Sequence, residues 1–331
     1  MSKARQLADL GNQVDDGAIT GTNMVINGGL TVWQRGTSVT GAGSNGYSTA
    51  DRWQHNASGG SLDLSQQSFA LGQTDVPSQF KYFMRVACTT GNNNAGMWQK
   101  IEDVTSVQGT VTVSFYAKGT NPNGGEFELN IRQNFGSSGS TEVEQNKTFT
   151  VSSSWQRFTF VVQLEDISGK TVSGGNDYVW VYFRQPSADT STNAWTLDFT
   201  GVCLNVGDSA IDFPHESYGE TLAKCQRYCC KHEATNDYDF MFLGYVENGS
   251  AFRAVVNYPV EMRADPSFSA SGSWRLALGS QADQDVTFST ASSNTTRLTC
   301  YVQYVGSSLT LGHAGIALGY AGAKVIFDAE L

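Results

Sequence analysis

The densest group of potential metal ligands lies between residues 225 and 232. It consists of Cys225, Cys229, Cys230 and His232. Thiolates and imidazoles of this kind bind zinc in structural sites, which usually combine two closely spaced ligand pairs. The other three cysteines, at positions 88, 203 and 300, stand singly in predicted strands and supply no second pair. We therefore predict thiols packed as small apolar side chains, with zinc or a disulfide between neighbouring chains as the alternatives.

Acidic residues at alternate positions form a second group. Glu126 and Glu128, and again Glu142 and Glu144, are each two residues apart. A glycoside hydrolase needs two carboxylates across one bond, but this spacing is also the period of a strand with one solvated face. No nucleophile elbow, phosphate loop, His-Glu-x-x-His motif or calcium loop is present, and the four histidines are far apart. We predict a protein without catalytic activity.

Aromatic residues near polar turns point to a third chemistry, the binding of sugars. Sugar sites combine an aromatic platform with amide and acidic side chains in a shallow groove. Most of the seven tryptophans fall in strand patterns and are expected to pack between sheets. Trp98 follows the polar run Asn92–Gly96 and is the one most expected at the surface, followed by Tyr47 and Trp274. These three residues are the predicted glycan contacts.

The composition favours an all-β protein and excludes several partners. Only 16% of the residues are charged and 35 of 331 are glycine, as in proteins with many short strands and turns. The net charge of -10, without a basic cluster, argues against nucleic acid as a partner. No apolar run is long enough to span a membrane, and no signal peptide is visible at the N-terminus.

Strand patterns predict two β bodies. In the first, strands are expected at 111–117, 127–132, 155–164, 178–183 and 195–204, after a brief strand at 24–26. In the second they are expected at 240–246, 251–260, 286–289, 298–305 and 324–329. Many strands without helices between them favour antiparallel pairing in a two-sheet sandwich. The predicted domains are a short N-terminal segment (1–22), a sandwich (23–212), a linking helix (213–234) and a smaller antiparallel β domain (235–331).

The linking segment contains the only long predicted helix, Phe213–His232. Ser217 and Glu220 form a capping box, which satisfies two backbone N–H groups at a helix start. Leu222, Cys225 and Cys229 then recur at helical spacing and define one apolar face. This face must be buried against another surface.

Several sequence blocks resemble the tail-fibre proteins of tailed bacteriophages. They span residues 23–331 in the order found in that family. The blocks are NMVINGGL (23–30), WQRG (33–36), YSTADRW (47–53), PHESYGE (214–220), CQRY (225–228), PVEMRADP (259–266) and DAEL (328–331).

The resemblance implies a homotrimeric virion component with a jelly-roll sandwich like a carbohydrate-binding module. It implies that the N-terminal segment is an arm that docks on the phage tail through Arg5, Leu7 and Leu10; from the residues alone, a frayed tail is the alternative. Carbohydrate modules of this fold often hold a structural calcium ion, for which Asp198 is the candidate ligand here. Phe199 stands where many of those modules carry a second aspartate.

We therefore expect a non-enzymatic tail-fibre or tail-tip protein that contacts the host surface, through a glycan or a protein. It would be assembled in the host cytoplasm and located in the virion tail. In a trimer, Leu222, Cys225 and Cys229 would be buried at the three-fold axis. The alternatives are a structural virion adaptor or decoration protein that binds other virion proteins, and a polysaccharide depolymerase.

Overall fold

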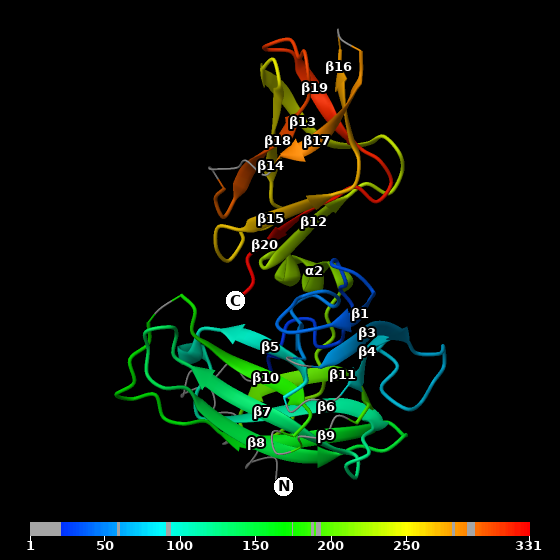
Figure 1. The fold of residues 1–331 in the computed structure, drawn as a ribbon. Helices are drawn as coiled ribbons and strands as arrows, with labels where there is room; N and C mark the ends of the chain where they lie inside the picture. Colours follow the sequence, from blue (N-terminus) through cyan, green and yellow to red (C-terminus); the bar gives the residue numbers. More distant parts are fainter. Residues whose placement is uncertain are drawn as a thin grey trace. The chain divides into compact units, whose positions relative to one another are not determined.

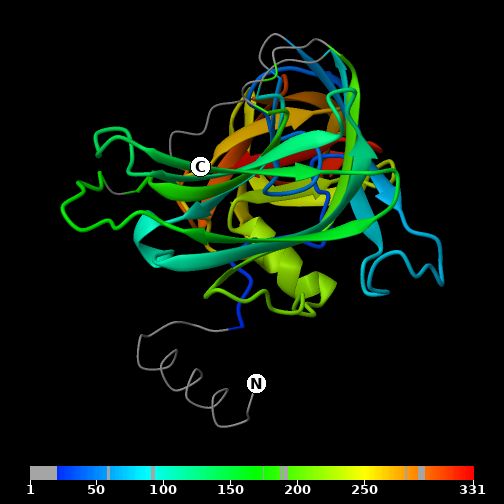
Figure 2. The same cartoon turned by 90° about the horizontal axis from the view of Figure 1, so that it is seen from below.

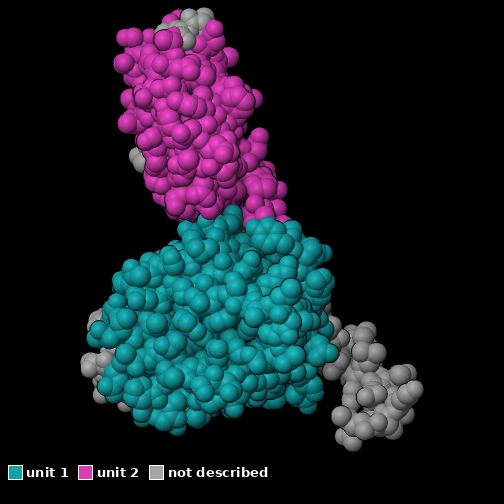
Figure 3. All heavy atoms as spheres, turned by 90° about the vertical axis from the view of Figure 1, so that its right-hand side faces the viewer, with its two compact units in different colours: residues 1–221, 331 teal, residues 222–330 magenta. Residues whose placement is uncertain are grey.

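The structure is a computed structural model that describes residues 21–57, 60–90, 94–173, 175–186, 189, 193–279, 282–289 and 295–331. The chain divides into two compact units (Figure 3): unit 1 comprises residues up to 221 together with Leu331, and unit 2 comprises residues 222–330. The three residues of the predicted docking arm, Arg5, Leu7 and Leu10, lie outside the described residues.

The strands described in unit 1 form two antiparallel sheets (Figure 1). They are β1 Ser38–Ala42, β2 Gln54–Asn56, β3 Ser61–Ser68, β4 Tyr82–Thr90, β5 Gly96–Glu102, β6 Thr110–Thr120, β7 Glu126–Asn134, β8 Val143–Thr150, β9 Gln156–Gln163, β10 Tyr178–Arg184 and β11 Trp195–Val206, with a 3-10 turn, η1, at Val104–Ser106. One sheet has the order β1-β3-β4-β11-β6-β9 and the other β2-β5-β10-β7-β8. The chain passes repeatedly from one sheet to the other, which is the jelly-roll arrangement.

The core of unit 1 lies between these sheets because alternate residues of each strand face inward. On β10 the inward residues are Val179, Val181 and Phe183, all buried. Phe183 packs against Phe115 of β6, with ring centroids 4.5 Å apart. The loop 69–81 between β3 and β4 projects from the edge of the sandwich, as two views show (Figures 1 and 2).

A buried asparagine side chain organises the loops that precede the sandwich. The Asn27 Nδ2 donates to the carbonyls of Val32 (2.9 Å) and Asp51 (3.1 Å). Its Oδ1 accepts from the backbone N–H groups of Thr31 (2.8 Å) and Val32 (3.1 Å), and its own carbonyl accepts from the Trp53 indole (3.2 Å). Asn27 has a φ of 57°, a conformation that asparagine tolerates better than most residues.

Other residues of the same sequence blocks support this centre. The buried Asp51 carboxylate accepts from both the backbone N–H (2.9 Å) and the side-chain amide of Gln34. Gly28 lies so close to β11 that a Cβ atom there would come within 2.0 Å of the Val202 carbonyl oxygen. The NGG, WQRG and ADRW blocks therefore build the fold through buried hydrogen bonds and close backbone packing.

Unit 2 consists of a three-stranded sheet and a closed barrel in its described residues. The sheet has the order β12-β20-β15 and the barrel the order β13-β14-β18-β17-β16-β19. The strands are β12 Cys229–Glu233, β13 Asp239–Asn248, β14 Ala251–Asn257, β15 Ser267–Ser271, β16 Trp274–Leu278, β17 Gln284–Ser289, β18 Thr299–Val305, β19 Ala314–Gly319 and β20 Lys324–Asp328. The prediction of an all-β chain with a second, smaller antiparallel region is confirmed.

The predicted long helix is only partly correct. Helix α2 covers Tyr218–Gln226, and it begins with the expected capping box, in which the Ser217 N–H donates to Glu220 at 2.7 Å. The chain then turns into β12, so Cys229 lies on a strand and shares no helical face with Leu222 and Cys225. Strand pairing with β20 provides the backbone hydrogen bonds that the predicted helix would have formed.

Burial distinguishes these three residues. Cys225 and Cys229 are fully buried within their own chain, whereas Leu222 is half-buried. Their role at a trimer interface stays a prediction. A further correction concerns residues 24–26, which form no strand. Ile26 is instead held by the Gln99 side chain, which bonds to its N–H (2.8 Å) and its carbonyl (2.7 Å).

We predict that Asn27→Ala lowers the free energy of unfolding of unit 1 by about 3 kcal/mol, because buried backbone groups lose their partners. Chemical denaturation of the purified protein measures this change. Asn123 is exposed in a turn, and Asn123→Ala is the control that should leave stability within about 0.5 kcal/mol. Equal stability of the two variants would contradict the structural role of Asn27.

Candidate functional site

The outward face of the five-stranded sheet carries an aromatic row. On β10, Tyr178, Trp180 and Tyr182 alternate with the inward-facing core residues, so all three lie on the side away from the core. Trp98 on the neighbouring strand β5 is paired directly with Tyr182 in the strand register. The sheet thus has an apolar core on one side and an aromatic surface on the other.

The aromatic rings of this surface form a tight cluster. The Trp98 ring centroid lies 5.2 Å from that of Trp180 and 4.8 Å from that of Tyr182. Both indoles are fixed by hydrogen bonds, from Trp98 Nε1 to Gln54 Oε1 and from Trp180 Nε1 to Asn130 Oδ1, each 2.6 Å long. The rings are therefore held in place before any ligand arrives.

Arginine side chains lie over and beside the rings. The Arg132 guanidinium carbon is 4.0 Å from the centroid of Trp180, a cation–π distance. Arg132 also pairs with the carboxylates of Glu142 (2.6 Å) and Glu144. Arg132 is thus held between the ring below it and the carboxylates of β8 and the preceding loop.

A second, more buried ion pair lies deeper in the same face. The Arg184 Nε donates to the Glu128 carboxylate at 2.6 Å, and both side chains are almost fully buried. Arg184 also donates to Asn94 Oδ1 at 2.7 Å. Burial raises the pKa of Tyr182 to about 12, so its hydroxyl stays protonated and donates to the Asn94 carbonyl.

These side chains surround a hollow of about 420 Å³ on the sheet surface. Its lining consists of aromatic rings, paired charges and amides: Asn56, Asn94, Trp98, Arg132, Glu144, Asn146, Trp180, Tyr182 and Arg184. All of them belong to unit 1. The hollow combines a rigid aromatic floor with fixed hydrogen-bond donors and acceptors, which is the usual construction of a binding site for a polar organic ligand.

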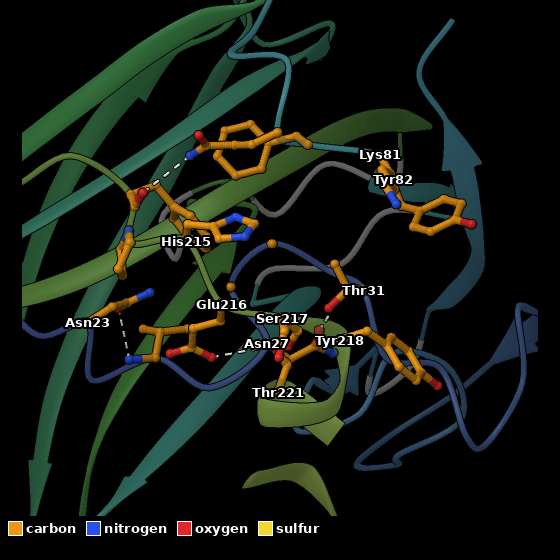
Figure 4. A pocket seen from close by; sticks show the side chains of 17 residues that line it. Asn23, Asn27, Thr31, Lys81, Tyr82, His215, Glu216, Ser217, Tyr218 and Thr221 are labelled. Carbon is orange, nitrogen blue, oxygen red and sulfur yellow. Dashed lines mark hydrogen bonds between the residues drawn. The ribbon is translucent and has the colours of Figure 1, made fainter. Parts of the chain in front are cut away.

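A pocket of about 360 Å³ lies at the other sequence blocks of unit 1 (Figure 4). Several of its polar side chains serve the fold. Asn23 bonds to the backbone of Val25, Val202 and Leu204, while Ser217 and Thr221 take part in the first turn of α2. This pocket brings the NGG and PHESYGE blocks together.

The structure places the predicted glycan contacts differently from the sequence prediction. Trp98 does line the hollow, but it is 6% exposed, with its ring held among other aromatics. Tyr47 is half-buried, stacks 5.1 Å below the Arg35 guanidinium and does not line the hollow. Trp274 lies in unit 2, is 2% exposed and packs against Phe288 and Tyr304, so its expected exposure was wrong.

The candidate calcium ligand has a protein partner. Both oxygens of the buried Asp198 carboxylate accept hydrogen bonds of 2.8 Å from Arg85. This bidentate pair accounts for the buried charge without a metal. Calcium binding by Asp198 stays a prediction.

The cysteine side chains of the group at residues 225–232 are buried within unit 2. Cys230 and His232 are neighbours on β12, with Sγ and Nε2 3.7 Å apart, and burial lowers the pKa of His232. Within the described ranges, no cluster of three or more His, Cys, Asp or Glu side chains has the geometry to hold a metal ion. Nor does any described helix have the length and apolar character to cross a membrane.

Sequence reasoning missed most of the residues that form the hollow. The predicted strand 178–183 includes Trp180 and Tyr182 only as strand residues and ends before Arg184, and the sequence gives no reason to name Arg132 or Asn146 as contacts. The available signal is the two-residue spacing of Tyr178, Trp180 and Tyr182. The residues between them, Val179, Val181 and Phe183, are all apolar and supply the side of the strand that faces the core. Such a strand must place one aromatic row outside the core.

The comparisons with known proteins bear on the fold only. No family model and no curated protein sequence matches this chain. Among solved structures, it is similar to a xylan-binding CBM22-2 domain of Xyn10C from Paenibacillus barcinonensis (13% identity, 47% of this chain and 92% of that chain, TM-score 0.33). It is also similar to a family 11 carbohydrate-binding module from Clostridium thermocellum in complex with a beta-1,3-1,4-mixed-linked tetrasaccharide (13% identity, 54% of this chain and 99% of that chain, TM-score 0.30). These scores are too low to support any conclusion about the ligand, and the resemblance to tail fibres stays a prediction.

We predict that Glu128→Gln lowers the free energy of unfolding by about 3 kcal/mol, because it leaves the buried Arg184 charge with only the Glu144 carboxylate, 3.9 Å away. The change is measurable by urea denaturation. The pair of Glu142 with Arg132 is far more exposed, so Glu142→Gln should cost less than about 1 kcal/mol. Similar losses for both variants would contradict the distinction between the two ion pairs.

Proposed function

We propose that the hollow on the five-stranded sheet binds a neutral saccharide. The observation that carries this proposal is the combination of Trp98, Trp180 and Tyr182 with Arg, Asn and Glu side chains in one fixed network. A sugar has apolar C–H faces and hydroxyls that both donate and accept hydrogen bonds. The lining offers partners for both.

Charge balance supports a neutral ligand. The guanidinium groups of Arg132 and Arg184 are already paired with the carboxylates of Glu142, Glu144 and Glu128. No unpaired positive charge is therefore left in the lining to favour a uronic or sialic acid. The exposed Asn146 amide N–H groups face no acceptor in the described part of the chain and are open to a ligand hydroxyl.

The same ion pairs support binding without catalysis. A glycoside hydrolase needs one carboxylic acid that is protonated when it meets the substrate. Each carboxylate beside the hollow accepts hydrogen bonds from an arginine. This pairing occupies oxygen atoms that a general acid would have to turn toward the glycosidic bond.

We further propose that the chain is a tail-fibre or tail-tip protein of a tailed bacteriophage that contacts the host surface through this site. The support is the ordered set of sequence blocks from residue 23 to residue 331, several of which build the buried centre around Asn27. Antibody labelling of intact virions tests this role. Labelling away from the tail would favour the decoration-protein alternative, and release of reducing ends from a host polysaccharide would favour a depolymerase.

We predict that Asn146→Ala weakens binding of a neutral glycan about tenfold, because one amide contact of about 1.4 kcal/mol is lost. A glycan array followed by isothermal titration calorimetry measures the effect. Thr148→Ala is the matched control: Thr148 lies two residues along β8 on the same exposed face, outside the lining. Absence of any neutral glycan ligand, or unchanged affinity in Asn146→Ala, would contradict the proposal.

A trimeric fibre would need an interface, and the barrel of unit 2 offers the best support for one. Of the eleven large apolar side chains exposed in the described residues, eight belong to this smaller unit. Leu243 on β13 and Val255 on β14 are 72% and 61% exposed, on strands paired through Gly244 and Ala254. Because the barrel is closed, a second copy would pack through side chains rather than by adding a strand.

We predict that the double substitution Leu243→Lys and Val255→Lys converts a trimer to monomers, because each lysine would place a charge in the apolar contact. Sedimentation velocity reports the change. Leu71 is fully exposed in a loop of unit 1, and Leu71→Lys should leave the trimer intact. A monomeric native protein, or an unchanged trimer in the double variant, would refute this interface.

A further inference from the structure

A second hollow, of about 840 Å³, lies on unit 2 and is not part of the site proposed above. It is bounded by the turn between β15 and β16, by β17 and by the residues that follow β18. All of its lining residues belong to unit 2. Its floor includes the rings of Trp274 and Phe288, whose centroids are 5.8 Å apart.

The floor contains a buried hydrogen-bond donor without a partner. The Nε1 of Trp274 is inaccessible and donates to no group in the described part of the chain. A buried N–H without an acceptor costs about 1–3 kcal/mol. Because the atom is covered in this conformation, the indole would have to turn toward the hollow before a ligand oxygen could accept this hydrogen bond.

The rim contains a carboxylate that is held in position. The Asp285 Oδ1 accepts from Arg275 Nε at 2.8 Å and from the Tyr320 hydroxyl at 3.0 Å. Its Oδ2 receives no hydrogen bond from the described residues. The hydrogen bond from Arg275 lowers the pKa of Asp285, so the free oxygen remains a charged acceptor that faces solvent.

The walls add hydroxyl groups that the protein does not use. Ser271, Ser273, Thr287 and Ser307 line the hollow, and their side chains make no hydrogen bonds within the described residues. Each hydroxyl can donate one hydrogen bond and accept others. The hollow therefore presents donors and acceptors above an aromatic floor. The described residues that line it include no lysine or arginine, and the Arg275 guanidinium beside it is already paired to Asp285.

We propose that this hollow is a second saccharide site, which binds a neutral sugar. The partly exposed Phe288 ring of the floor fits the apolar face of a pyranose ring, and the wall groups fit its hydroxyls. The Asp285 oxygen accepts a sugar hydroxyl and repels a carboxylate or phosphate. The chain would then carry one sugar site in each unit, and two linked sites raise the effective affinity for a repetitive glycan without any new contact.

Fluorine NMR of the full chain labelled with fluorotryptophan tests the proposal. The seven tryptophans give separate reporters for the two sites, and a Trp274→Phe spectrum identifies the Trp274 resonance. The probes are the methyl glycosides of glucose, galactose, mannose, xylose, rhamnose and N-acetylglucosamine. The methyl glycoside of galacturonic acid, with its carboxylate free, is the acidic comparison. At least one neutral glycoside should shift the Trp274 resonance in a saturable manner.

Two variants and one control decide the outcome. Asp285→Asn should weaken the binding seen at Trp274 about tenfold, and Ser307→Trp, which fills the hollow, should abolish it. Asp283→Asn makes the same charge change at an exposed position outside the lining and should leave binding unchanged. No saturable shift at Trp274, an equal response to the acidic glycoside, or an unaltered response in Ser307→Trp would overturn the proposal. The Trp98 and Trp180 resonances report on unit 1 independently, so failure of one site is distinguishable from failure of the other.

Discussion

Strand β10 has to satisfy two different environments at once, and much of unit 1 depends on how it does so. Its odd-numbered residues from Val179 to Phe183 complete the core of the sandwich. Its even-numbered residues from Tyr178 to Arg184 face the other way, between β5 and β7. Because side chains alternate strictly along a strand, a one-residue shift in register would exchange core and site.

The outward face of this strand is itself nearly buried. Trp180 and Tyr182 are only 7% and 2% exposed, because Trp98, Arg132 and their neighbours cover them. Charges in such surroundings are stable only when they are paired, and each arginine here has a carboxylate partner. The requirement for pairing fixes the side chains, and the fixed side chains give the hollow its shape before a ligand is bound.

The sequence blocks that suggest a tail fibre have a physical explanation that is independent of any ligand. Asn27 ties together the backbone at Thr31, Val32 and Asp51, and Gly28 permits close approach to β11. Such positions tolerate few other residues because the Asn27 side chain completes the hydrogen bonding of several buried backbone groups at once. The blocks therefore identify how the domain begins, whereas the groups that would meet a ligand lie on other strands.

The sequence by itself determined the all-β class, the antiparallel pairing and five of the eleven strands described in unit 1, because two-residue periodicity is a local property. These five are β6, β7, β9, β10 and β11. It also determined the capping box at Ser217 and Glu220. It misplaced Cys229, because its pairing partner on β20 lies about 100 residues away and outweighs the helical pattern.

Burial was decided only by the tertiary structure. Trp98 and Trp274 look alike in sequence as exposed aromatics. In the structure, Trp98 lies in a network beside the hollow of unit 1, and Trp274 forms part of the floor of a hollow in unit 2. Side chains from all five strands of the sheet meet at the unit 1 hollow through non-local register, which a single strand pattern does not contain.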